Sequence, residues 1–266
     1  MIKRTFFSII IATVLWGCDV VTDNDRLTVV PFDVKKPVVI MDFTGWNCTN
    51  CPNAARTIQN MREFDFVSDK IIAVAMHPEG IHWTEPEGDA IDLRSEAATE
   101  YWKYFGSPQA FPVGSVDFVE YNNSLLIPEK NWNSAVAQRI AMDVPLEIEI
   151  NCNISTTTGK VEIISTITST ADTNDSYSLI LWITENNVIG LQLDNGVYIQ
   201  NYRHNHVLRS AINGIWGETI SFSGNNCVKT QTCNLNPTWN IQNCAIVGII
   251  INSNTKEAVV SCEKAL

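Results

Sequence analysis

Basic residues and histidines are both scarce in this sequence. It has 18 lysines and arginines against 29 aspartates and glutamates, which gives a formal net charge of -11, and it has only four histidines. An acidic surface repels phosphate groups, so this balance argues against nucleic acid and anionic lipid headgroups as partners.

Hydrophobic runs long enough to span a membrane are also lacking at the amino terminus. The apolar run of residues 6–16 follows two basic residues and is too short for a spanning helix, but it has the form of a secretory signal. It ends in the letters LWGC, which resemble a bacterial lipobox. In that class of signal Cys18 becomes the first mature residue and carries the lipid anchor. The alternative is an ordinary cleaved signal in which Cys18 has no role.

Cleavage before Cys18 would change the formal charge from -11 to -13, because the signal contains two basic residues and no acids. Attachment to a membrane would then depend on acyl chains alone. We predict a signal peptide at residues 1–17 and a polar, acidic tether at residues 18–36.

The chain has one Cys-x-x-Cys pair and no second one, which argues against a zinc site. Cys48 and Cys51 lie in VVIMDFTGWNCTNCP, residues 38–52, where a buried apolar strand leads through a short turn into a helix. This is the thioredoxin-type redox arrangement. The helix N-terminus favours a Cys48 thiolate, and Cys51 is placed to resolve a mixed disulfide. The alternatives are a structural disulfide or half of a zinc site.

Two further residues support the redox interpretation. Asp42 lies within the apolar run, where an unpaired carboxylate is costly, so we predict a buried proton acceptor for Cys51. Pro112 precedes the apolar residues 113–119 and is the candidate for the cis-proline that thioredoxin-like folds place against the cysteine pair.

Three residues are candidates for a substrate groove. Trp46 and Phe111 would either form a peptide-binding rim or cover the core, and His77 would either line the groove or lie in a solvated loop. We predict no metal site. His204 and His206 lack an apparent third ligand, so a buried polar cluster or an interdomain contact is the favoured interpretation.

Eight cysteines suit an oxidising envelope compartment. Cys227 and Cys233 are close together in a polar stretch, and we predict a disulfide between them. The pairing of Cys152, Cys244 and Cys262 is left open.

The hydrophobic pattern changes near Pro145. Residues 37–143 alternate strands and helices, which predicts a thioredoxin-like α/β domain with a helical insertion. Residues 144–266 show alternating polar and apolar positions, as in residues 146–155, and predict an all-β domain resembling an antiparallel sandwich. This second domain contains no evident catalytic constellation.

The lipobox, GWNCTNCP, FPVGSVD and NYRHNHVLR together resemble the twenty-eight-kilodalton outer-membrane protein family of Bacteroidetes. The resemblance covers nearly the whole mature chain. It implies an envelope lipoprotein with a thioredoxin-like domain, sometimes described as an adhesin. It also implies that Cys48 and Cys51 are the redox pair, Asp42 the buried acid and Pro112 the cis-proline.

The sequence is compatible with two functions. The first is thiol-disulfide exchange with envelope proteins, without a cofactor, by a protein lipid-anchored at the outer membrane on its periplasmic face or the cell surface. The second is an outer-membrane adhesin or binding protein, in which the β-domain contacts a protein partner and the cysteine pair is structural.

Overall fold

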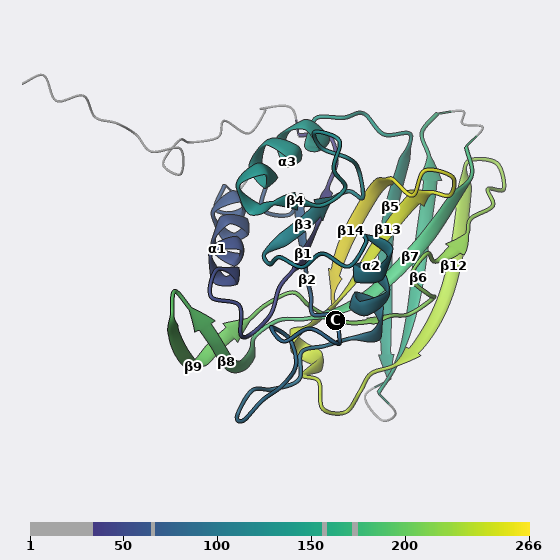
Figure 1. Cartoon of the computed structure of the whole chain (residues 1–266). Coiled ribbons are helices and arrows are strands. Elements are labelled where there is room, and N and C mark those ends of the chain that lie inside the picture. Colours follow the sequence, from purple (N-terminus) through teal and green to yellow (C-terminus); the bar gives the residue numbers. More distant parts are fainter. Residues whose placement is uncertain (1–33, 65–66, 156–158, 172–174) are drawn as a thin grey trace, which may run out of the picture.

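The computed structural model describes residues 34–64, 67–155, 159–171 and 175–266. The predicted signal peptide, Cys18 and most of the tether lie outside the described residues. Within the described ranges the chain is mostly β, with 14 strands and three α-helices (Figure 1).

The amino-terminal half begins with a strand, a helix and a parallel strand: β1 (Val38–Phe43), α1 (Cys51–Arg62) and β2 (Ile71–Met76). Every residue of β1 is buried, because its sequence is apolar except for Asp42. Strand β3 (Val113–Val116) pairs antiparallel with β1 on its other side, followed by β4 (Ile127–Pro128). The helices α2 (Glu96–Tyr104) and α3 (Trp132–Ile140) complete this half.

One sheet joins the two halves of the chain. Its strand order is β14-β13-β7-β10-β2-β1-β3-β4, with β11 (Glu218–Thr219) paired to β7. The carboxy-terminal half supplies β7 (Tyr177–Glu185), β10 (Val207–Ala211), β13 (Cys244–Asn252) and β14 (Ala258–Ala265). The junction is the parallel pairing of β10 with β2, where Val207 lies opposite Ala75. The predicted boundary at residue 144 therefore does not separate two sheets.

A second, three-stranded sheet covers one face of the carboxy-terminal strands (Figure 1). It consists of β5 (Leu146–Ser155), β6 (Lys160–Ser169) and β12 (Asn226–Asn234), all antiparallel. Buried side chains at alternate positions of β5 and β6 pack against β7 and β13 in one apolar cluster. The all-β character predicted for this half from its alternation is confirmed.

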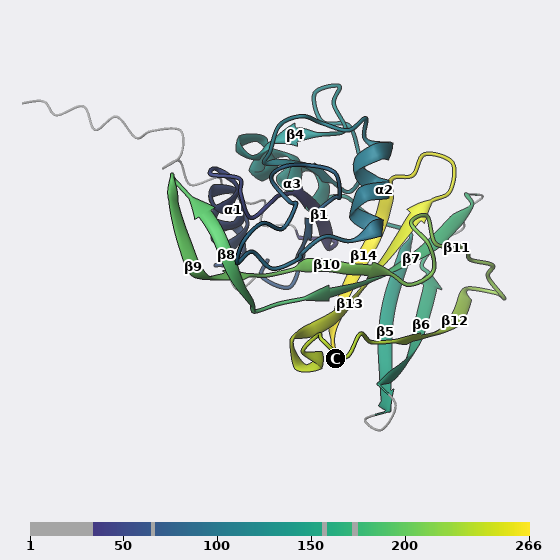
Figure 2. The ribbon, with the colours of Figure 1, turned by 60° about the horizontal axis from the view of Figure 1, so that its bottom comes forward.

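A two-stranded hairpin leaves the main body and lies beside α1 (Figures 1 and 2). It is formed by β8 (Val188–Asp194) and β9 (Val197–His204), joined by a tight turn. Because a lone hairpin is marginally stable in water, its position depends on contacts with the amino-terminal half.

Ser95 caps α2, and its Oγ accepts a hydrogen bond of 3.2 Å from the backbone N–H of Ala98. We expect Ser95→Ala to lower the free energy of unfolding by about 1 kcal/mol, because a helix donor loses its partner. Urea titration would measure the loss. Ser134→Ala, at an exposed position of α3, is the control and should match the wild type. Equal effects at the two positions would contradict the capping role.

Candidate functional site

Cys48 and Cys51 form a disulfide at the amino-terminal end of α1, with their Cα atoms 5.4 Å apart. Cys51 is the first helical residue and Pro52 the second, a position that tolerates proline because its N–H would have no helical partner. The Cys51 N–H donates to the Cys48 carbonyl at 3.2 Å. The pair is covered, since Cys48 is 3% and Cys51 2% exposed.

Asp42 lies in β1, six residues before Cys48, and is 4% exposed. Among the described residues its Oδ1 has no hydrogen-bond partner. Burial raises the pKa of this carboxyl to about 8, and the nearby charge of Glu129 acts in the same direction. Asp42 is therefore mostly protonated at neutral pH. Because its pKa is close to that pH, it can both donate and accept a proton.

The Phe111–Pro112 peptide bond is cis, as the sequence predicted. Strand pairing brings it close to the end of β1, because Val113, the next residue, lies opposite Phe43. The catalytic role of Pro112 stays a prediction.

Aromatic side chains pack around the cysteine loop. The Phe111 ring lies 5.1 Å from that of Trp83 and 6.5 Å from that of Phe43, measured between centroids. Trp46 is 4% exposed, and its indole N–H donates to the Glu85 carbonyl at 2.9 Å. Trp46 is therefore part of the buried core in this structure, and a role in substrate binding stays a prediction.

His77 is buried, so the solvated loop that the sequence suggested for it is wrong. Burial lowers the pKa of His77 to about 3, with smaller contributions from His204 and Arg209. The ring follows β2 directly, and the apolar strand carries it into the interior. His77 is neutral at physiological pH.

His204 and His206 lie in a buried polar cluster that connects the two halves. Burial lowers the pKa of each to about 4. Nη1 of Arg62, at the end of α1, lies 3.0 Å from Nε2 of His206. Nε2 of His204 lies 3.3 Å from the Leu191 carbonyl oxygen. Across the described ranges no group of three or more metal-ligating side chains occurs. Both histidines thus contact side chains of the amino-terminal half, as the interpretation as a contact between the two parts of the chain predicts.

A cavity of about 590 Å³ lies beside the pair, between α1, β2 and the hairpin. Its walls include one cysteine, the buried acid and three imidazoles: Cys51, Asp42, His77, His204 and His206. Three arginines, Arg56, Arg62 and Arg203, also line this cavity. A Cys51 thiolate released when the disulfide is reduced would therefore meet polar and basic side chains rather than a dry apolar core.

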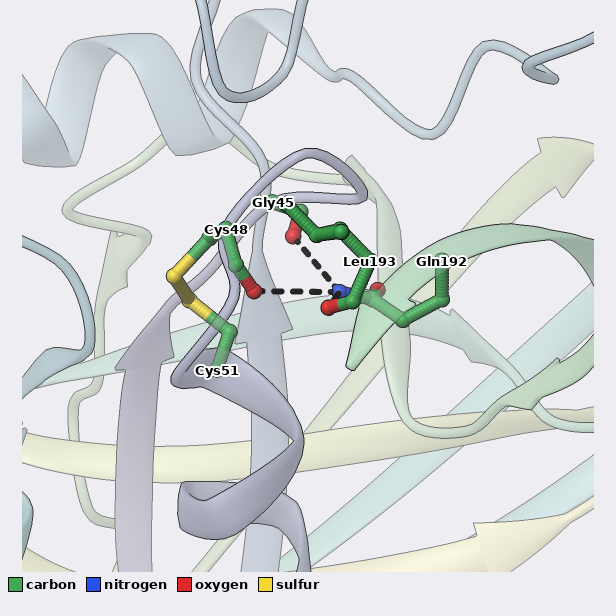
Figure 3. Close-up of a disulfide and its surroundings, with 5 residues drawn as sticks. All are labelled: Gly45, Cys48, Cys51, Gln192 and Leu193. Carbon is green, nitrogen blue, oxygen red and sulfur yellow. Dashed lines mark hydrogen bonds between the residues drawn. A yellow bond between two sulfur atoms is a disulfide. The ribbon is translucent and has the colours of Figure 1, made fainter. Parts of the chain in front are cut away.

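Sequence reasoning missed the residues that hold the cysteine loop from outside. They are Gln192, Leu193, Asn195 and Tyr198, all in or between β8 and β9 (Figure 3 shows the first two). Asn195-Gly196 between alternating apolar residues is a strong hairpin signal, so the hairpin was detectable in the sequence. Its packing against the cysteine loop was not, because that contact spans about 145 residues of chain.

The predicted Cys227–Cys233 disulfide is wrong. Both residues lie in β12, six positions apart in an extended strand, so their Cα atoms are separated by about 20 Å, far beyond disulfide reach. The stretch is polar because it is an exposed strand rather than a loop. Five cysteines are free in the part of the chain that is described: Cys152, Cys227, Cys233, Cys244 and Cys262.

Comparison with known proteins relates the chain to outer membrane proteins. The family model described as outer membrane protein Omp28 matches residues 95–266. Cys48, Cys51 and Asp42 precede the matched range, whereas Pro112 and the hairpin lie within it. No curated protein matches the chain.

One solved structure extends the likeness beyond the residues that the family model matches. HBP35 of Porphyromonas gingivalis is 16% identical with a TM-score of 0.70, over 87% of this chain and 76% of that one, which shows a shared fold. Protein AGR_C_4864 from Agrobacterium tumefaciens is 13% identical with a TM-score of 0.49, over 86% and 94% of the two chains. A domain of the outer membrane lipoprotein Omp28 from Porphyromonas gingivalis is 20% identical with a TM-score of 0.36, over 46% and 88%. None of the helices described here is long and apolar enough to cross a membrane.

Proposed function

The chain belongs to the outer membrane protein Omp28 family, and from this premise we propose that it performs thiol-disulfide exchange on proteins of the cell envelope. Family membership confirms the predicted location at the outer membrane. Attachment through a lipid on Cys18 is part of the proposal. The observation that carries the exchange function is the disulfide at a helix N-terminus beside a buried acid whose pKa is raised to about 8.

We also propose that residues 37–143 form a thioredoxin-like α/β domain, within the larger sheet. Three features support it: β1, α1 and β2 form a parallel strand-helix-strand unit, β3 runs antiparallel to β1, and a cis proline directly precedes β3. In this arrangement Pro112 would hold the backbone against which an extended substrate pairs.

The proposed exchange follows from the positions of the two sulfurs and the acid. A substrate thiolate attacks Cys48 Sγ, the bond to Cys51 breaks, and Cys51 leaves as a thiolate that takes a proton from Asp42. A second substrate thiolate then attacks the substrate sulfur of the mixed disulfide, and Cys48 leaves as a thiolate. The substrate loses two electrons as its disulfide forms, and the cysteine pair gains them. The reverse sequence reduces a substrate disulfide.

The test is the reduction potential of the pair. The purified protein is equilibrated across glutathione ratios, quenched with an alkylating agent, and each cysteine is assigned by peptide mass spectrometry. We expect a reversible transition confined to Cys48 and Cys51 between about -270 and -120 mV, the range of thioredoxin-like proteins. A pair that stays oxidised below about -300 mV would be a structural disulfide and would contradict the proposal.

A binding function is the second candidate, and one observation favours it. The hairpin exposes four large apolar side chains: Ile189, Val197, Tyr198 and Ile199. Exposed apolar clusters often mark protein interaction sites. A variant with both Cys48→Ser and Cys51→Ser separates the candidates, because an adhesin would keep its partner and show no redox phenotype.

A further inference from the structure

Gln192 belongs to β8 in the carboxy-terminal half, yet its side chain reaches the cysteine loop. It is 3% exposed, and its Nε2 lies 3.2 Å from the Gly45 carbonyl and 3.3 Å from the Cys48 carbonyl (Figure 3). The same amide also donates to the Leu193 carbonyl at 2.9 Å. A single buried side chain thus contacts the loop on both sides of Trp46 and Asn47.

The two loop carbonyls that Gln192 contacts already close the turns of that loop. The Gly45 carbonyl accepts from the Cys48 N–H, and the Cys48 carbonyl accepts from the Cys51 N–H, each at 3.2 Å. The second of these turns sets the spacing of the two cysteines. The Gln192 amide nitrogen has two protons, and with one donated to the Leu193 carbonyl the other is shared between these two acceptors, so the side chain ties the two turns together.

The hairpin backbone continues the same contact along the loop. The Leu193 N–H donates to the Trp46 carbonyl at 2.7 Å, and the Asn195 N–H donates to the Thr49 carbonyl at 3.0 Å. At the edge of the contact, the Tyr198 hydroxyl donates to Asn47 at 3.0 Å and Asp194 pairs with Arg56. Gln192 is the buried centre of an interface whose rim is polar and more exposed.

We propose that Gln192 is a positioning residue for thiol-disulfide exchange, which acts by holding the turn between Cys48 and Cys51 in the geometry of the closed disulfide. This inference rests on the proposed function. A held turn keeps the two sulfurs close after reduction, which raises their effective concentration toward one another and favours the disulfide. The carboxy-terminal half therefore takes part in the chemistry by setting how easily the pair is reduced.

The test is Gln192→Met, which keeps the length of the side chain and removes the donors. We expect about a tenfold smaller equilibrium constant for disulfide formation, which corresponds to a reduction potential higher by about 30 mV. In the reduced protein Cys48 should also react faster with an alkylating agent. The control is Gln200→Met, the same change at an exposed position of β9, which should leave both quantities at their wild-type values.

Gln192→Asn is a second variant, in case the methionine prevents folding. It keeps a buried amide but withdraws it by one methylene from the two carbonyls, so the potential should rise in the same direction. If either variant folds and keeps the wild-type reduction potential and alkylation rate, the positioning role of Gln192 is overturned while the proposed function stands. A wild-type pair that does not exchange with glutathione would overturn the proposed function, and this inference with it.

Discussion

Asp42→Asn is expected to raise the free energy of unfolding above that of the wild type, and by more at neutral pH than at acidic pH. The pKa of Asp42 is about 8 in the folded state, because of burial, against about 3.9 in an unfolded chain. Between these values the unfolded chain releases a proton that the folded protein keeps. The favourable contribution of Asp42 is therefore complete below the unfolded pKa and is lost as the pH rises toward 8.

The size of this effect follows from the separation of the two pKa values. Between pH 4 and pH 7 the wild type should lose about 4 kcal/mol of unfolding free energy through this one group, and Asp42→Asn should not. Chemical denaturation at both pH values measures the difference between the two proteins. Asp69→Asn, at an exposed carboxylate, is the control and should follow the wild type. A wild type and Asp42→Asn variant with parallel pH profiles would contradict a raised pKa.

The same substitution should impair exchange while it improves stability. Asparagine has no proton to give to the departing Cys51 thiolate, and loss of a general acid or base typically costs at least about a hundredfold in rate. Single-turnover oxidation of a model dithiol peptide, followed by stopped flow, would measure the rate. An unchanged rate in a protein with an intact disulfide would exclude Asp42 from the proton transfer.

Asp117→Asn is expected to be among the most destabilising single changes in the chain. The Asp117 carboxylate is 1% exposed and lies 2.6 Å from the Lys36 ammonium and 3.0 Å from Nε of Arg139. Its other oxygen accepts the Val39 N–H at 2.9 Å. Removal of one partner from a buried ion pair leaves an uncompensated charge, which costs about 3–5 kcal/mol.

This network also connects the two halves of the chain. The Lys36 ammonium donates to the carbonyls of Ala258 and Val259 in β14, and Arg139 donates to that of Ala258 as well. Burial lowers the pKa of Lys36, which shows that the ammonium depends on its partners to stay charged. We therefore expect the loss of Asp117 to weaken the packing of β14 against the amino-terminal half.

Guanidinium denaturation of Asp117→Asn measures the loss. The control is Asp143→Asn, which removes the exposed pair between Lys35 and Asp143 and should cost less than about 1 kcal/mol, because water screens that pair. A double variant, Lys36→Met with Asp117→Leu, should recover only part of the stability, because Arg139 then loses Asp117 and keeps Glu257 as its carboxylate partner, and the Val39 N–H still loses its acceptor. An Asp117→Asn variant as stable as Asp143→Asn would contradict the importance of the buried network.

Several parts of the fold and site were predictable because their signals are local. The alternation in residues 146–155 specifies a half-buried strand whatever it packs against, since successive side chains point to opposite faces. The apolar run before Cys48 and the proline after Cys51 likewise specify a buried strand and a helix start. The cis bond at Pro112 was predictable from its place before an apolar strand.

The mistaken predictions depended on the surroundings of a residue. Cys227 and Cys233 were close in sequence, but an extended strand carries them apart, and their polar neighbours face water from a strand. His77 follows a strand among loop residues, and its burial, which makes it neutral, depends on tertiary packing that includes His204 of the carboxy-terminal half.

The sequence by itself determined the chemistry available to this protein: one Cys-x-x-Cys pair at a strand-to-helix turn, an acid within the preceding apolar strand, and a proline suited to a cis bond. Only the tertiary structure decided that β10 pairs with β2, so that one sheet crosses the expected boundary, and that the β8–β9 hairpin covers the cysteine loop. The physical reason is that hydrophobic period specifies which face of a strand is buried. The partner at its edge is selected by hydrogen bonds and packing between residues far apart in the chain.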